Sequence, residues 1–205
     1  MSKGKYFYSK GEGNDGYIKN LEVLSYCDMD GTCGMFQMAL YRTEAGRYLL
    51  YGACFAAGPD GVGIMISDVT DPRNPVFIKK WLPFSIDEYP TTSIPKLQIA
   101  DDKLIFALTS GSGPSVLVGD RAKMKSLQGI MIYDLKKDPE NPEYLGYWDC
   151  GVPYSMGVHR FMYNGGDYVH LSSEADEFEG LIYRIVSIAD PANPVEVGRW
   201  WAPHQ

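Results

Sequence analysis

The sequence predicts an all-β protein, organised as a partial β-propeller of four-stranded blades. Three observations support this fold class. One stretch is written three times, at 63–75, 129–142 and 183–194, each time with an Asp-Pro-x-Asn-Pro core. A Trp follows the first Asp of each core by ten residues. The 205 residues include 15 Tyr, 22 Gly and 13 Pro, which favour strands and tight turns, and sustained helical periodicity is absent.

Each copy of the stretch supplies the last two strands of a predicted four-stranded unit. First strands are expected at 35–41, 96–100 and 158–163, and second strands at 48–54, 104–109 and 168–172. Third strands are expected at 64–69, 130–135 and 182–188, and fourth strands at 76–81, 143–148 and 195–201. Gly, Asn and Asp between the first two strands are typical of hairpin turns. The second Pro of each core begins the fourth strand, where it removes no ladder hydrogen bond. Four antiparallel strands per repeat are typical of propeller blades.

The unit boundaries give the predicted domain organisation. Residues 1–16 form a loose lead-in, 17–28 an outer strand, and 29–82, 83–149 and 150–201 three blades. An insertion at 110–128, with a short helical turn near 121–128, lengthens the middle unit. Three blades do not close a ring, since propellers typically have four to eight. Two alternatives follow: the chain is part of a longer propeller of roughly six or seven blades, or a homo-oligomer of two copies completes one ring.

The repeated stretch resembles a known repeat family. Its Gly-Ile-Met-Ile-x-Asp beginning and Asp-Pro-x-Asn-Pro end resemble the LVIVD repeat, a β-propeller repeat family of bacteria and archaea. The resemblance covers residues 20–201 and implies a propeller fold, and the motif carries no catalytic residue. Many members of the family are described as surface or secreted proteins. The third copy lacks the Asp that precedes the turn in the other two, which indicates a turn role for Asp68 and Asp134.

Composition restricts the classes of partner and the compartment. A formal charge of −7 and a pI near 4.9 count against nucleic acid and anionic membranes as partners. No apolar run has the length of a signal peptide or a membrane span. In a chain without an export signal, the four cysteines are expected to be thiols in a reducing compartment. The sequence therefore predicts a cytoplasmic protein.

Meander topology sends alternate connections to opposite ends of each blade. The hairpins and the Asp-Pro-x-Asn-Pro turns are expected at one end. The long, irregular loops are expected at the other, at 27–33, 55–62, 82–95, 110–128, 149–157 and 173–179. Because irregular loops on a rigid scaffold usually carry function, the loop end is the expected functional end.

Polar residues at the start of the first strands are the main candidates for a ligand site. His159 and Arg160 begin one such strand, and Lys96 and Gln37 occupy roughly the same place in the other blades. Such a ring at the mouth of a central channel could bind a small polar or anionic ligand. The alternative is a solvated channel without a ligand. His170, inside a second strand, is expected to be a hydrogen-bonded core residue.

Acidic residues of the loops are weaker candidates. Asp28 and Asp149 occupy matching places, which indicates a turn role beside a ligand-binding one. Glu174 belongs to an acidic loop that could also be simply solvated. No spacing of Cys, His or carboxylates predicts a metal site, and no motif predicts a cofactor.

The sequence leaves two candidate functions open. The first is a non-enzymatic binding or scaffolding module that presents loops to a small ligand or a protein partner. The second is a hydrolase, lactonase or isomerase acting on a small polar substrate in the channel. His159, Arg160 and Lys96 would carry that chemistry, with acidic help from Asp87, Glu88 or Glu174. Propellers host both kinds of function, so whether the chain is an enzyme stays open.

Overall fold

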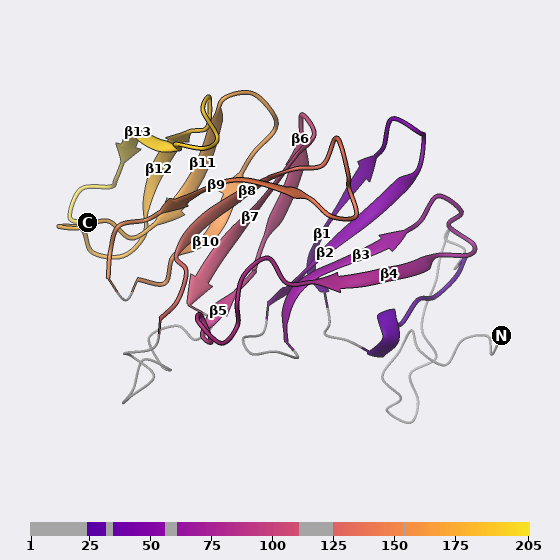
Figure 1. Ribbon diagram of the computed structural model, residues 1–205. Coiled ribbons are helices and arrows are strands. Elements are labelled where there is room, and N and C mark those ends of the chain that lie inside the picture. The colour runs from indigo at the N-terminus through magenta and orange to yellow at the C-terminus, as the bar shows by residue number, and fades with distance from the viewer. Residues whose placement is uncertain (1–23, 32–34, 56–60, 111–124, 154) are drawn as a thin grey trace, which may run out of the picture.

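The computed structural model describes residues 24–31, 35–55, 61–110, 125–153 and 155–205. These residues form three antiparallel sheets that follow one another along the chain, as the colours of Figure 1 show. The all-β class expected from the repeats is confirmed. The described helical structure is one short 3-10 turn, η1 (Met29–Gly31).

Each sheet is a meander of neighbouring strands. Sheet 1 contains β1 (Met35–Arg42), β2 (Tyr48–Phe55), β3 (Val62–Asp68) and β4 (Val76–Trp81). Sheet 2 contains β5 (Thr92–Ser93), β6 (Leu97–Ala100), β7 (Lys103–Ser110), β8 (Gly129–Asp134) and β9 (Glu143–Asp149), with β5 and β6 both paired to β7. Sheet 3 contains β10 (Val158–Met162), β11 (Tyr168–Ser173), β12 (Ile182–Ser187) and β13 (Val195–Trp200). The strands predicted for the three four-stranded units are reproduced within two residues, and β5 is an additional strand.

The Asp-Pro-x-Asn-Pro cores are self-contained turns. In the first, the Asn74 backbone N–H donates to the Asp71 carbonyl at 3.0 Å, and the Arg73 N–H donates to Asp71 Oδ1 at 3.0 Å. The Asn74 side chain donates to Asp71 Oδ2 at 2.7 Å, and this bond is the main reason that the pKa of Asp71 is lowered. The same side-chain bond recurs from Asn141 to Asp138 and from Asn193 to Asp190. The repeated residues are therefore explained by turn structure.

The middle hairpin turn is tight. Asp101 and Asp102 have φ values of 48° and 58° and form a two-residue turn between β6 and β7. Positive φ at both positions matches the right-handed twist of the paired strands, and Asp tolerates this region better than most residues. The turn therefore fixes the register in which Leu97 pairs with Phe106.

The core lies between the sheets. One cluster joins Leu49, Tyr51 and Ile64 of sheet 1 to sheet 2, and a second joins sheet 2 to sheet 3. Sheet 2 is therefore covered on both faces. This explains why Leu104–Leu108 is an uninterrupted run of fully buried side chains, whereas in β1 exposed residues alternate with half-buried or buried ones.

Hairpins and proline turns of neighbouring sheets meet at one end of the molecule. The Tyr41 hydroxyl donates to Asp102 at 2.9 Å, and the Gly166 N–H donates to Asp101 at 2.6 Å. The opposite end carries the loops, where the Met156 N–H donates to Glu174 at 3.1 Å. This is the expected division into a turn end and a loop end.

Two expectations are corrected in the first quarter of the chain. The outer strand expected at 17–28 has no strand in its described part, 24–28; residues 17–23 lie outside the described residues. Instead, the Ser25 hydroxyl donates to the Pro72 carbonyl at 2.6 Å, so the segment is held by a side-chain bond beside the first turn. Cys54 is disulfide-bonded, so the expectation of four thiols is wrong, although Cys27 and Cys150 are free. Disulfide formation depends on how closely two side chains approach in space, which sequence spacing does not determine.

The structure also bears on a membrane location. Across the described ranges, no helix has both the length and the apolar character needed to cross a bilayer.

Candidate functional site

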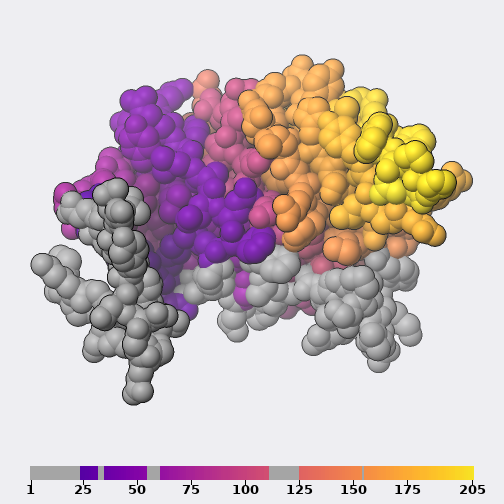
Figure 2. Space-filling view, turned by 180° about the vertical axis from the view of Figure 1, so that it is seen from behind, coloured from indigo at the N-terminus to yellow at the C-terminus, as the bar shows by residue number. Residues whose placement is uncertain are grey.

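The first strands of the three sheets lie next to one another. The Leu97 N–H of β6 donates to the side-chain oxygen of Gln37 on β1 at 3.2 Å. The Tyr163 N–H, directly after β10, donates to the side-chain oxygen of Gln98 on β6. Figure 2, seen from behind, shows indigo and orange residues of sheets 1 and 3 close together with magenta residues of sheet 2 between them. The side of the molecule formed by β1, β6 and β10 is therefore continuous.

Lys96, His159 and Arg160 come together on this side; we call them the cationic cluster. His159 is half-buried, and Arg160 beside it on β10 is exposed. Burial lowers the pKa of His159, and the positive charges of Arg160 and Lys96 lower it further. Lys96 lies directly before β6, and its ammonium sits 4.2 Å from the centre of the Phe36 ring of β1. Arg160 and Lys96 therefore place positive charge around His159.

Gln37 has a different role from the cluster. Its side-chain oxygen accepts the Leu97 N–H, so it joins sheet 1 to sheet 2. A glutamine at an inner strand can satisfy a backbone donor of the neighbouring strand as readily as a ligand, and the sequence does not distinguish these partners.

The three acidic candidates accept hydrogen bonds that hold their loops in place. Asp28 Oδ1 accepts the Asp30 N–H at 3.2 Å within a tight turn. Asp149 accepts the Gly151 N–H at 2.7 Å and the Tyr147 hydroxyl at 2.9 Å. Glu174 accepts the Met156 N–H at 3.1 Å. Within the described part of the chain, no group of three or more His, Cys, Asp or Glu side chains is placed to hold a metal ion.

Arg184 of β12 organises the loop end and was missed from the sequence. Its side chain is 7% exposed and donates to Glu196 at 2.9 Å, with a second, shorter bond to the same oxygen. It also donates to the carbonyls of Cys150 and Glu174, both at 2.8 Å, and to Ser173 Oγ at 3.1 Å. One guanidinium therefore ties two loops to sheet 3. Alignment of the three repeats could have revealed this residue, because Arg184 stands where the other two copies have Met65 and Met131.

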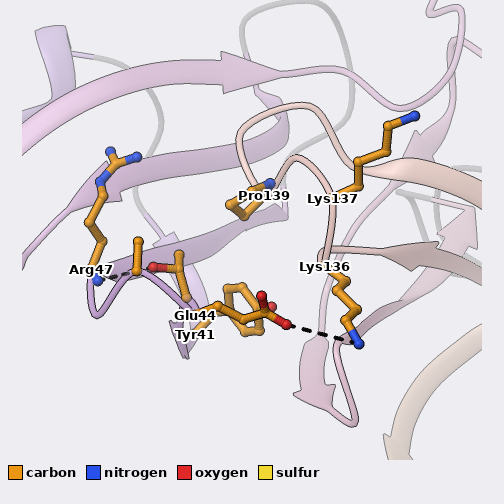
Figure 3. Close-up of a pocket in the computed structure, with 8 residues that line it drawn as sticks. Tyr41, Glu44, Arg47, Lys136, Lys137 and Pro139 are labelled. Atoms are coloured by element: carbon orange, nitrogen blue, oxygen red, sulfur yellow. Dashed lines mark hydrogen bonds and ion pairs between the residues drawn. The ribbon is translucent and has the colours of Figure 1, made fainter.

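A pocket of about 240 Å³ lies at the turn end, between the hairpin of sheet 1 and the proline turn of sheet 2 (Figure 3). It is lined by Tyr41, Thr43, Glu44, Ala45, Arg47, Lys136, Lys137 and Pro139. Arg47 pairs with Asp68 at 2.9 Å and with Glu140 at 2.8 Å. Sequence reasoning assigned this end a structural role. The pocket could have been suspected from Lys136 and Lys137, because the turn that contains them is one residue longer than the matching turn of the other two repeats.

His170 has the hydrogen-bonded role expected of it, although it is half-buried rather than enclosed. Its Nδ1 lies 2.5 Å from the Tyr183 hydroxyl, and the two rings stack with centroids 5.9 Å apart. Much of the expected loop end, at 32–34, 56–60, 111–124 and 154, lies outside the described residues. In comparisons with known proteins, no family model matches the chain and no curated protein matches it.

Proposed function

We propose that the chain is a non-enzymatic binding module of the LVIVD-repeat type, whose three sheets are blades of a β-propeller. Its ligand is anionic and binds at the cationic cluster of Lys96, His159 and Arg160. The proposal draws on the thrice-repeated turn, the three consecutive meanders and the continuous side formed by the first strands.

The observation that carries the proposal is the charge around His159. The charged groups that shift its pKa are Arg160 and Lys96, and both are positive. Such a histidine stays neutral near pH 7 while two cations lie beside it. An anion placed among them would gain from both charges and would favour the protonated imidazole, which adds a third donor. Binding and the pKa of His159 are therefore expected to rise together.

The enzymatic alternative, a hydrolase, lactonase or isomerase, would use His159, Arg160 and Lys96 with acidic help from Asp87, Glu88 or Glu174. General acid–base chemistry by His159 would be helped by a carboxylate that orients the ring. Asp149 and Glu174 use their oxygens on backbone donors of the loops. Glu88 lies 3.8 Å from Lys125.

The test is a titration of the chain with inorganic phosphate, followed by NMR of the His159 ring. We expect saturable shifts and a rise in the pKa of His159 when phosphate is present. Arg160→Gln and Lys96→Gln should each weaken binding roughly tenfold, the effect of one lost charge-assisted hydrogen bond. Lys125→Gln is the control, because Lys125 is an exposed lysine paired with Glu88 outside the cluster.

Two results would overturn the proposal. One is a pKa of His159 that phosphate leaves unchanged. The other is an equal loss of binding in the control variant, which would show that only the net charge matters.

A further inference from the structure

Two buried hydroxyl groups of sheet 2, Ser93 Oγ and Thr109 Oγ1, have no hydrogen-bond partner among the described residues. Ser93 is 0% exposed and Thr109 is 3% exposed. Hydroxyl groups enclosed in a protein normally find partners, because an unpaired one forfeits the hydrogen bonds that it would make with water. This pair therefore marks a place where a ligand atom would supply the missing bonds.

The two hydroxyls belong to neighbouring strands and share one face of sheet 2. Ser93 of β5 lies directly opposite Thr109 of β7, and the side chains of directly opposite residues project to the same face. Ala107, two residues before Thr109, packs in the cluster between sheets 2 and 3, so this is the face toward sheet 3. Opposed Ser and Thr side chains commonly hydrogen-bond to each other, but these two do not. One oxygen atom between them can accept a hydrogen bond from each, since opposed Cβ atoms are about 4.5–5.5 Å apart.

The hydroxyl groups next to this pair, by contrast, are already bonded. Thr92 Oγ1 accepts the Leu127 N–H at 2.8 Å, and Ser110 Oγ donates to the Ser155 carbonyl at 3.1 Å. These bonds fasten β5 and the end of β7 to neighbouring loops. The structure of this region therefore accounts for Thr92 and Ser110 and leaves the two unpaired hydroxyls unexplained.

The hydroxyl pair adjoins the cationic cluster along two strands. On sheet 2, the Ala107 N–H donates to the Lys96 carbonyl at 2.9 Å, and Thr109 is two residues further along β7. On the side of sheet 3, Gly157 forms a β-bridge with Thr109, and His159 is two residues further along the chain. Two residues of extended strand span about 6.6 Å. The backbone positions of both cluster residues therefore lie on the order of 7 Å from the hydroxyl pair.

We propose that the ligand of the cationic cluster is a small organic anion that also carries an uncharged oxygen, as a phosphorylated polyol or sugar does. Its anionic group binds the cluster, and its hydroxyl or carbonyl oxygen accepts hydrogen bonds from Ser93 and Thr109. An uncharged oxygen fits this pair better than a second carboxylate, because burying a charge against neutral donors alone is costly. The inference rests on the proposed function and adds the class of ligand.

Movement of β5 gives a ligand access to the buried pair. This strand is two residues long and lies beside the end of β7, at the loop end of the molecule (Figure 1). It pairs with β7 at two positions, Thr92–Ser110 and Ser93–Thr109, so its separation breaks few backbone hydrogen bonds. Local openings of this kind cost far less than unfolding. The hydroxyls are therefore reached while the rest of sheet 2 stays intact.

Methyl phosphate and glycerol phosphate test the inference, because both are phosphate esters and only the second carries free hydroxyl groups. Their dissociation constants are measured by NMR titration of the chain. Glycerol phosphate should bind roughly fivefold more tightly, the effect of about one net hydrogen bond. The substitutions Ser93→Ala and Thr109→Val should each remove most of this difference and leave the affinity for methyl phosphate unchanged. Neither removes a bonded hydroxyl, so both variants should be at least as stable as wild type, as urea unfolding checks.

Ser110→Ala is the matched control, since its hydroxyl is buried next to Thr109 but is already bonded to the Ser155 carbonyl. It should leave the difference between the two esters unchanged. Equal affinities of wild type for the two esters would overturn the inference and leave the proposed function intact, as would a difference that survives in both hydroxyl variants. A loss of stability in both hydroxyl variants would also overturn it, by showing that a buried water already bonds the pair. Failure of both esters to bind would refute the proposed function, and this inference with it.

Discussion

Arg184 is the side chain whose loss should most destabilise the protein. The substitution Arg184→Met installs the residue that the other two repeats carry at this position, Met65 and Met131. It removes five hydrogen bonds from one buried guanidinium and its cation–π contact, 4.6 Å from the centre of the Trp148 ring. It also leaves the buried acceptors of the two loops without this donor.

The magnitude follows from these contacts. Removing one partner of a buried ion pair costs about 3–5 kcal/mol. The lower end applies here, because Glu196 keeps Arg199 at 2.7 Å and the methionine side chain refills part of the volume. We expect the free energy of unfolding to fall by about 3 kcal/mol, equivalent to roughly 6–12 °C in Tm for a chain of this size.

Urea unfolding followed by circular dichroism measures this change, at one protein concentration for all variants. Arg199→Met is the matched control, since Arg199 bonds the same Glu196 but is 42% exposed, and surface pairs contribute about 0–1 kcal/mol. A double-mutant cycle with Glu196→Gln should give a coupling of about 1–2 kcal/mol. The reasoning is refuted if Arg184→Met lies within about 1 kcal/mol of wild type, or if Arg199→Met is the more damaging change.

Two further predictions concern acidic groups. Burial raises the pKa of Glu196, but hydrogen bonds from Arg184 and Arg199 outweigh it and hold the pKa below the ordinary 4.5. On acidification the unfolded chain takes up the proton first, so the stability that Glu196 contributes is present above pH 4.5 and is lost as pH falls through the folded pKa. The substitution Glu196→Gln should therefore make the free energy of unfolding, measured with urea, less dependent on acid pH. An unchanged pH dependence in this variant would contradict the prediction. Asn141→Ala should raise the pKa of Asp138 toward 3.8 while that of Asp71 stays lowered by its own Asn, and carboxyl NMR that showed no difference would exclude the proposed turn bonds.

The sequence was sufficient for the sheets because their determinants are local. Each Asp-Pro-x-Asn-Pro core closes its own hydrogen bonds within four residues, so its appearance in the sequence is enough to place a turn. Alternation and turn residues then place the strands on either side. The neighbouring positions of the first strands were also predictable from the repeats, whereas a ligand site at Lys96, His159 and Arg160 stays a prediction.

Only the tertiary structure decided which partners these side chains take. The side chains of Gln37 and Asp149 carry oxygens that could bind a ligand. These oxygens instead accept hydrogen bonds from backbone N–H or hydroxyl groups of the protein itself. The hydrogen bond from Arg184 to the Cys150 carbonyl joins strand β12 to a loop residue 34 positions earlier, and no local pattern predicts it. Trp148 is buried because it packs in the cluster between sheets 2 and 3, which its local sequence does not reveal. Local sequence determines turns and strands through short-range hydrogen bonds, whereas burial and pairing depend on long-range packing.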